Sequence, residues 1–461
     1  MDTTTERLTA YAMDLSYEDL PPEVVDRTKR LILDTIGCAL GASPYKAPAA
    51  ARALAEDSMS KTPSTVMASG HQASPDIAAF ANGVMTRYLD YNDYYHDIGG
   101  GHPSDTLAPA LAAVEAVNGD GKAAILGMVL GYEIILGLGD SAASTKTPGW
   151  GTGSFQVIAA AISASKLMGL TKQQTEHAVS MAISSHLSNG RSRGGQISNW
   201  KAATSANDSR NGVFCALAAK KGLSGPNGAF GGRRGFFELT GNKFDILPLG
   251  GEKGRAFRIM GAQIKAHPAG YPSHSGIDAA VELHPKIKNP ADIKEVRLFT
   301  ARSGMGYANE QEAWHPETRE RADHSHAFIL SLALTEGSVQ VRHFEEAYYK
   351  KPALVELMQK VKVSVGEESE KAYHENHDGM PMAVLEVEMK SGEVHKTKKG
   401  FDRTRAEFLR TDAGQDKKLR PMIDAVLSKE QGDQLVKSLR TLDQQRSLKD
   451  VLALTVPARK K

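Results

Sequence analysis

The order of two hydrophobic patterns along the chain sets the first limit on its fold. From Pro22 to about residue 240, apolar residues recur mostly at helical spacing, and small residues are abundant, as in 159–165. Small side chains let packed helices approach closely. After residue 260, three segments alternate apolar and polar residues as half-buried strands do, at 295–300, 360–365 and 383–389. The sequence therefore predicts an all-helical domain followed by a smaller α+β domain.

The end of the chain turns helical again, with apolar residues at helical spacing in 419–427 and 430–442. The chain has 461 residues, which is long for a single hydrophobic core and favours two domains. We therefore expect three segments. They are the first part of an all-helical domain at 1–262, an α+β domain at 263–403, and a helical segment at 404–461 that returns to the first domain.

Composition excludes several classes of partner. The chain carries 56 basic and 54 acidic residues, a net charge of +2, which gives no electrostatic basis for binding nucleic acid or an anionic membrane. No uninterrupted apolar run reaches the ~18–20 residues that span a bilayer. The only cysteines are Cys38 and Cys215, too few for a disulfide framework or an iron–sulfur cluster. With no basic, apolar leader at the N-terminus, we expect a cytoplasmic protein.

One loop concentrates titratable groups. Between Arg87 and Asp105 the chain places four aspartates, two histidines and an asparagine, with a glycine run at 99–101. The candidate catalytic residues are Asp90, Asp93 and His102, and Asn92 is a candidate substrate contact. A dense group of acids and bases on a glycine-rich loop is typical of proton-transfer sites.

The two aspartates of this loop are three residues apart. On a helix Asp90 and Asp93 would share a face and raise one another's pKa. The alternative is a polar loop in which Ser104 or Asp105 caps the helix that starts at Leu107. The spacings match no standard metal motif, so we expect no metal.

Two further clusters carry cationic side chains. Arg193 lies on a glycine-containing loop, where a guanidinium suits carboxylate recognition, and Lys201 begins a helix of small residues. Lys265, Tyr271 and His274 lie where the pattern changes from helical to mixed, and binding sites favour such domain junctions. The alternatives are a lysine that snorkels to solvent and a Pro/Gly linker with incidental histidines.

A fourth cluster runs from Arg319 to His326 and leads into an apolar helix. Asp323 or Ser325 fits a helix cap there, and a structural role is favoured for His324 over one in a site. The chain contains no phosphate-binding glycine motif, so we expect no nucleotide cofactor.

These clusters, in this order, resemble the MmgE/PrpD family, which includes 2-methylcitrate dehydratase, cis-aconitate decarboxylase and iminodisuccinate epimerase. The segments that carry the resemblance are 31–42, 89–93, 101–105, 200–207, 211–214, 222–226, 235–237 and 315–325. The run at 316–325 is most similar to the methylcitrate dehydratase branch.

The resemblance implies a large all-helical domain built from both chain ends, a smaller α+β lid domain, and a site between them. It also implies a homodimer and chemistry on a small di- or tricarboxylic acid, with no metal or organic cofactor. The family's site residues carry over to Asp90, Asp93, His102, Lys201 and Lys265.

The chain departs from the family pattern at two places. Gly149–Thr152 lacks the histidine that commonly precedes the alanine-rich helix, and Gly270–Pro272 replaces a Glu-Tyr-His type run. A general acid is therefore missing or relocated, and His274 is the candidate that could take its place.

The sequence leads to the hypothesis of a cofactor-independent lyase of the dehydratase or hydratase type, which removes a proton beside a carboxylate. His102 is the first choice for proton transfer, because its pKa should lie near working pH, with Asp90 or Asp93 orienting it or serving as the base. His274 would protonate the leaving hydroxyl. Arg193, Lys201 and Lys265 would hold carboxylates. The alternatives are a decarboxylase or epimerase of the same family, or a catalytically silent homologue that acts as a binding protein.

Overall fold

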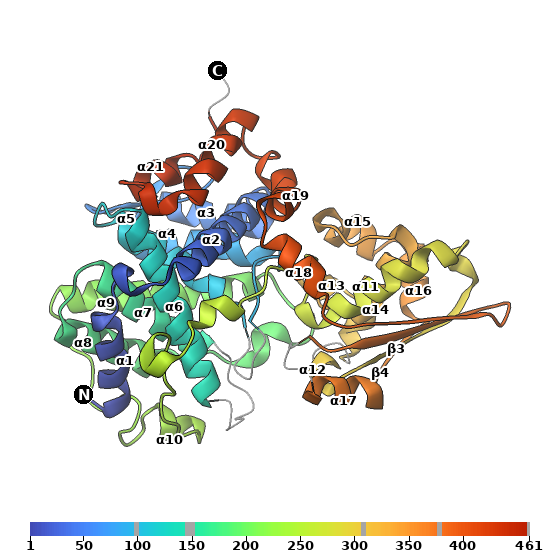
Figure 1. Ribbon diagram of the computed structural model, residues 1–461, viewed down its shortest axis with the longest axis horizontal. Helices are drawn as coiled ribbons and strands as arrows, with labels where there is room; N and C mark the ends of the chain where they lie inside the picture. Colours follow the sequence, from blue (N-terminus) through green and yellow to red (C-terminus); the bar gives the residue numbers. More distant parts are fainter. Residues whose placement is uncertain (96–100, 143–152, 306–309, 376–379, 459–461) are drawn as a thin grey trace.

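The computed structural model of the chain describes residues 1–95, 101–142, 153–305, 310–375 and 380–458. Helices fill the broad part of the molecule on the left of Figure 1, and the smaller part on the right carries a sheet. The expected fold class is confirmed: a large helical domain formed by both chain ends accompanies a smaller α+β domain.

The large domain combines helices from the two ends of the chain around one core. Leu31, Val157 and Leu435, which are far apart in the sequence, all belong to the same buried hydrophobic cluster. The N-terminal helices are α1 (Thr3–Asp14), α2 (Pro22–Ala42), α3 (Lys46–Glu56), α4 (Pro75–Tyr88), α5 (Leu107–Glu115), α6 (Gly121–Ala142), α7 (Gly153–Leu167), α8 (Lys172–Ser185), α9 (Trp200–Lys220) and α10 (Phe236–Thr240). The C-terminal helices are α18 (Arg403–Leu409), α19 (Asp412–Ile423), α20 (Lys429–Arg440) and α21 (Leu448–Ala453).

The large domain departs from the expected pattern in two details. It is not entirely helical, because β1 (Ser64–Thr65) and β2 (Gln72–Ala73) form a short antiparallel pair. By length and composition alone, helix α6 could cross a membrane, although Glu133 interrupts its apolar sequence. Since 78% of its apolar window is buried inside the protein, we describe α6 as a core helix.

The small domain is built on a four-stranded mixed sheet of order β4-β3-β5-β6. β3 (Ile293–Thr300) pairs with β4 (Val361–Val365) in parallel and with β5 (Ala383–Met389) antiparallel, and β6 (Val394–Lys399) forms the edge. The helices of this domain are α11 (His274–Leu283), α12 (Arg302–Met305), α13 (Arg319–Ala322), α14 (His326–Glu336), α15 (Glu346–Tyr349), α16 (Pro352–Met358) and α17 (Glu367–Glu375). A second hydrophobic cluster lies between this sheet and helices α11 and α14.

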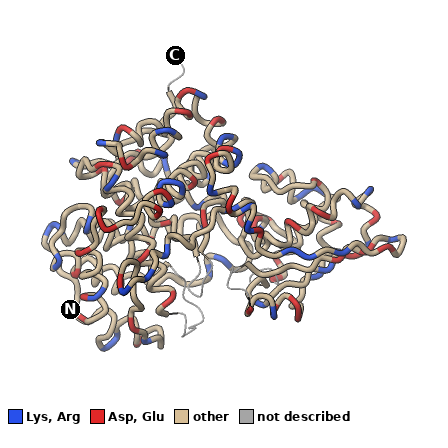
Figure 2. The backbone as a smooth tube through the Cα atoms, viewed as in Figure 1, with Lys and Arg blue, Asp and Glu red and all other residues tan. Residues whose placement is uncertain are grey.

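Local sequence signals explain several helix ends. Thr171 accepts from the backbone N–H of Gln174, and Gln174 accepts from that of Thr171, so a capping box opens α8. Ser325 accepts from the backbone N–H of Phe328 and caps α14, which leaves Asp323 free for another role. Acidic and basic residues are interspersed over both domains, in keeping with the small net charge (Figure 2).

Glycine allows the close approach of α7 and α9. A Cβ atom placed on Gly212 would lie 2.5 Å from the Cβ of Ala160 and 2.6 Å from the carbonyl oxygen of Val157. The backbone oxygen cannot move aside without breaking the helix, so a side chain at this position would force α7 and α9 apart.

We predict that Gly212→Ala lowers the free energy of unfolding by about 1–3 kcal/mol, the usual cost of overpacking a core. Urea denaturation followed by circular dichroism measures the change. Gly231→Ala is the matched control, because no heavy atom lies within 4 Å of the added Cβ. An equal effect of the two substitutions would contradict this account of the α7–α9 contact.

Candidate active site

Asp90 occupies a strained turn directly after α4. The helix ends at Tyr88, and the backbone N–H of Asp90 donates to the carbonyl of Arg87 over 3.2 Å. Asp90 has a φ of +50°, a left-handed conformation that few residues other than glycine adopt, and it is fully buried. The turn therefore fixes the direction of one buried carboxylate.

Three cations surround this carboxylate. Lys201 Nζ lies 2.6 Å from Oδ2, Arg87 Nη1 lies 3.2 Å from Oδ2, and Lys265 donates to Oδ1. His324 Nε2 is 3.3 Å from Oδ2. Burial opposes the charge of Asp90, but these cations outweigh it and hold its pKa well below the usual range. Asp90 is thus a fixed anion at neutral pH and too weak a base to abstract a proton from carbon.

Asp93 behaves in the opposite way. Its Oδ1 accepts from the backbone N–H of Ser104 over 3.1 Å, and its Oδ2 accepts from the hydroxyl of Tyr132. Burial raises the pKa of Asp93 to about 6. The expectation that Asp90 and Asp93 share a helix face and raise each other's pKa is wrong, because both lie beyond the end of α4 and Asp90 is held ionised.

His102 presents a lone pair toward the same cluster. Its Nδ1 lies 2.7 Å from the carbonyl oxygen of Asp93, which can only accept, so Nδ1 carries the proton. Its Nε2 faces Asp90 Oδ1 at 3.9 Å. Burial, followed by the charges of Arg87 and Lys265, lowers the pKa of His102 well below its usual value. The expected pKa near working pH is therefore wrong, and His102 is a neutral imidazole.

Asp323 and His324 complete the cluster from the small domain. Lys201 Nζ lies 3.1 Å from Asp323 Oδ1 and 3.0 Å from His324 Nδ1. Arg319 Nη1 donates to Asp323 Oδ2 over 3.2 Å and binds the carbonyl of Tyr88. Burial lowers the pKa of His324 to about 4. His324, for which the sequence favoured a structural role, therefore lies in the candidate site. Arg87, Arg319 and Asp323 lie there too, although the sequence did not assign them to a site.

Three of these side chains have the geometry of a metal-binding group. Atoms of Asp90, Asp323 and His324 lie within 4.8 Å of one another. The ammonium of Lys201 lies 2.6 to 3.1 Å from a ligand atom of each. A divalent cation there would meet that positive charge, so this donor set fits an ammonium rather than a metal.

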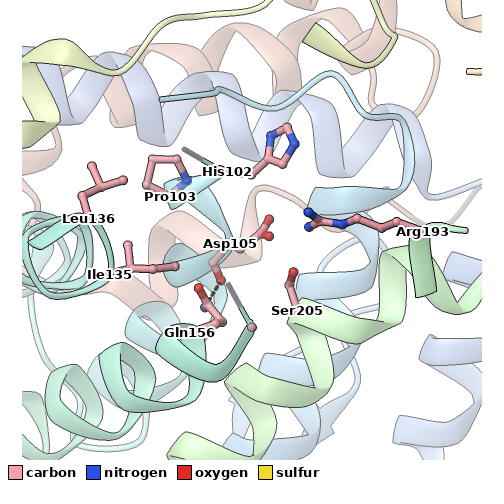
Figure 3. Close-up of a pocket in the computed structure, with 10 residues that line it drawn as sticks. His102, Pro103, Asp105, Ile135, Leu136, Gln156, Arg193 and Ser205 are labelled. Atoms are coloured by element: carbon pink, nitrogen blue, oxygen red, sulfur yellow. Dashed lines mark hydrogen bonds between the residues drawn. The ribbon is translucent and has the colours of Figure 1, made fainter. Parts of the chain in front are cut away.

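A pocket opens beside His102 (Figure 3). Asp105, Gln156, Ser205 and Arg193 line its polar wall, and the guanidinium of Arg193 points toward Asp105. Arg193 belongs to a short turn, η3 (Gly190–Arg193), and remains partly exposed. Its planar donors can therefore bind a carboxylate that enters the pocket.

Asn92 is fully buried and donates to Ser104 Oγ over 2.9 Å and to Asp105 Oδ1 over 3.2 Å, so it supports the Asp90–Asp105 loop, and its contact with substrate stays a prediction. Neither Ser104 nor Asp105 caps α5, because its N-cap residue is Thr106, which makes no side-chain cap bond. His96 and the Gly149–Thr152 departure lie outside the described residues.

Lys265 reaches the cluster around Asp90, whereas His274 faces the backbone of Ala269. Lys265 Nζ also donates to the carbonyls of Asp90 and Ala269, at 2.9 and 3.0 Å, and burial lowers its pKa to about 8. His274 is buried, with Nε2 3.3 Å from the carbonyl of Ala269, and Tyr271 stacks on Tyr94. We therefore correct the general-acid assignment of His274 to a structural role at the domain junction.

The chain matches two sequence profiles, the MmgE/PrpD N-terminal domain at residues 6–247 and the MmgE/PrpD C-terminal domain at residues 267–444. The second profile runs through α18 to α20, which the hydrophobic core joins to the large domain.

Curated relatives match the chain at about one quarter identity. The cis-aconitate decarboxylase-like protein oryM of Aspergillus oryzae is 26% identical, and the match covers 98% of this chain and 96% of the relative. Human cis-aconitate decarboxylase is 24% identical, covering 79% and 77% of the two chains. The 2-methylcitrate dehydratase of Salmonella typhimurium is 25% identical, covering 75% and 74%.

The raised pKa of Asp93 predicts a specific pH dependence of stability. Because the folded protein keeps the proton up to pH about 6, while a free aspartate loses it near pH 4, ionisation destabilises the fold as pH rises through this window. Asp93→Asn keeps the acceptor for Ser104 and removes the charge. We predict that, relative to wild type, its free energy of unfolding rises by up to about 3 kcal/mol between pH 4 and 7.

Urea denaturation at a series of pH values measures this difference. Asp57→Asn, at an exposed position, is the matched control. If the difference in the free energy of unfolding between Asp93→Asn and wild type stays constant from pH 4 to 7, burial does not raise the pKa of Asp93.

Proposed function

Because the chain belongs to the MmgE/PrpD family, we propose that it is a lyase that acts on a small di- or tricarboxylic acid. The family includes dehydratases and decarboxylases, which share a lyase-type reaction. We propose dehydration or hydration as the reaction, with a proton removed from the carbon next to a carboxylate. The observation that carries the proposal is the surplus of positive charge around Asp90.

The charges of the cluster favour an anionic substrate. Four buried cations, Arg87, Lys201, Lys265 and Arg319, lie against three carboxylates, those of Asp90, Asp323 and, at 3.9 Å from Arg87, Asp105. The imidazoles of His102 and His324 are neutral. Buried cations that outnumber the nearest anions stabilise added negative charge. Arg193 extends this positive field to the pocket in Figure 3. A substrate with two carboxylates supplies the missing charge.

His102 is the group best placed to take the proton. Its Nε2 carries a lone pair, and Asp90 lies 3.9 Å away to stabilise the imidazolium that forms. The carbanion that remains has enediolate character, and Lys201 and Arg193 would stabilise it. In a dehydration the hydroxyl on the neighbouring carbon then leaves as water, with a proton from the ammonium of Lys201. After product release His102 would return its proton to solvent, and Lys201 would regain one from solvent.

Decarboxylation is the second candidate. The relative whose match spans nearly the whole of both chains is named as a cis-aconitate decarboxylase-like protein. In that reaction a carbon–carbon bond breaks, CO2 leaves, and the resulting carbanion takes a proton that the ammonium of Lys201 would donate and then regain from solvent. The same cations would stabilise the same negative charge, so the product distinguishes the two reactions.

The remaining expectations stay predictions. We propose that the protein is a homodimer that uses no metal and no organic cofactor, as the resemblance implies, and that it is cytoplasmic, as its N-terminal sequence and few cysteines suggest. Sedimentation velocity measures the oligomeric state.

We predict that His102→Gln lowers the rate by about 10²–10⁴-fold, the usual contribution of one acid–base group. The assay incubates the enzyme in D2O with a panel that includes 2-methylcitrate and cis-aconitate and follows carbon-bound deuterium by NMR. His374→Gln, on an exposed helix of the small domain, is the control and should retain full activity.

The same spectra separate the reaction types. A new alkene signal indicates dehydration, loss of one carboxylate indicates decarboxylation, and deuterium exchange with scrambled stereochemistry alone indicates epimerisation. If no acid in the panel exchanges deuterium and His102→Gln binds these acids as wild type does, the enzyme hypothesis fails and the protein is a binding protein.

We further predict that dialysis against EDTA leaves the activity unchanged, because the ammonium of Lys201 fills the position that a divalent cation would take. Activity before and after dialysis is compared in the same assay. Loss of activity that added Mg²⁺, Mn²⁺ or Zn²⁺ restores would contradict this prediction.

A further inference from the structure

Helix α2 carries a fully buried carboxylate, that of Asp34, which takes no part in the proposed reaction. Asp34, Gly37 and Gly41 recur at helical spacing and so share one face of the helix. This face packs against α19. A Cβ atom on Gly37 would lie 2.9 Å from Leu419, and one on Gly41 would lie 2.7 Å from Met422. The glycines therefore let α19 approach α2 closely.

This approach brings Lys418 of α19 to Asp34. Lys418 Nζ lies 2.7 Å from Asp34 Oδ1, and both side chains are buried. The same ammonium donates to the carbonyl of Tyr91 over 2.9 Å and lies 4.2 Å from the centre of the Tyr91 ring. A buried ion pair is weak evidence for stability, because the cost of desolvation offsets the attraction. The contact with Tyr91 suggests another role for the pair.

Tyr91 directly follows the strained residue of the candidate site. Asp90 has a φ of +50°, and such a conformation persists only where several contacts enforce it. The carbonyl of Asp90 accepts from Lys265, and the carbonyl of Tyr91 accepts from Lys418. The hydroxyl of Tyr91 donates to the carbonyl of Ala266 over 3.2 Å. Two lysines from different segments thus hold two successive carbonyls of one turn.

We propose that Lys418, with Asp34 as its counter-ion, is a positioning residue for the active site. It holds the Tyr91 carbonyl and so keeps the carboxylate of Asp90 between Lys201 and Lys265. That Lys418 holds the turn is independent of the proposed function. That the turn matters for turnover rests on the proposed function.

The test removes both charges together, because Lys418→Met alone would leave Asp34 buried and unpaired. The double variant Lys418→Met/Asp34→Asn is therefore compared with Lys29→Met/Asp443→Asn. Lys29 Nζ and Asp443 Oδ1 are 2.8 Å apart and also tie α2 to the C-terminal part of the chain, but at η12 (Leu442–Gln444). Lys418→Arg keeps the charge and the donors and serves as the conservative variant.

The first measurement needs no substrate. Amide hydrogen exchange, followed by mass spectrometry, compares the peptide that spans residues 87–94 in the full-length variants. We expect faster exchange in Lys418→Met/Asp34→Asn and wild-type exchange in the Lys29/Asp443 control. Unchanged exchange in the first variant would show that Lys418 does not hold the turn and would overturn the proposal.

The second measurement is turnover of 2-methylcitrate and cis-aconitate. We expect kcat of Lys418→Met/Asp34→Asn to fall by about 10²-fold with little change in KM, the signature of misplaced catalytic groups. Lys418→Arg should recover part of this loss. If Lys418→Met/Asp34→Asn exchanges faster but its kcat is no lower than that of Lys29→Met/Asp443→Asn, Lys418 only stabilises the fold and does not position the site. If wild type turns over neither acid, the proposed function fails for these substrates and the exchange measurement alone decides whether Lys418 holds the turn.

Discussion

The buried charge of Asp90 is the constraint on which the rest of the site depends. A carboxylate without exposure to water is too costly to keep ionised unless cations accompany it. Arg87 from α4, Lys201 from α9 and Lys265 from the domain junction provide those cations. Because no single segment supplies more than one of them, the site forms only when the helices and the junction have packed together.

Helix packing delivers these cations to one point. Gly83 of α4 lies so close to α9 that a Cβ there would be 2.9 Å from that of Ala206. Arg87 is one helical turn beyond Gly83, so it reaches the same side of α4 that faces α9. Small residues at this contact therefore bring the cations of the candidate site together as well as allowing the helices to pack. Larger side chains at these contacts would separate Arg87 from Lys201.

Sequence patterns predicted the parts of this arrangement that depend on local order. Helical and strand spacing gave the fold class, and residue type placed Lys201 and Lys265 among the site candidates. The pKa of His102 could not be predicted, because it depends on Arg87 and Lys265 from other segments. From sequence, Asp323 fitted a helix cap and His324 a structural role, and only the packing of the two domains shows that they reach Lys201 and Asp90.

The same cations that would bind substrate also set the strength of the base. At rest, burial and the charges of Arg87 and Lys265 keep His102 neutral with a depressed pKa. A dicarboxylate in the pocket would place negative charge near these cations, and opposite charge nearby raises the pKa of an imidazole. In the proposed reaction His102 therefore gains base strength when an anion is bound. A neutral molecule of the same shape would lack this effect, so the charge of the substrate contributes to the chemical step as well as to binding.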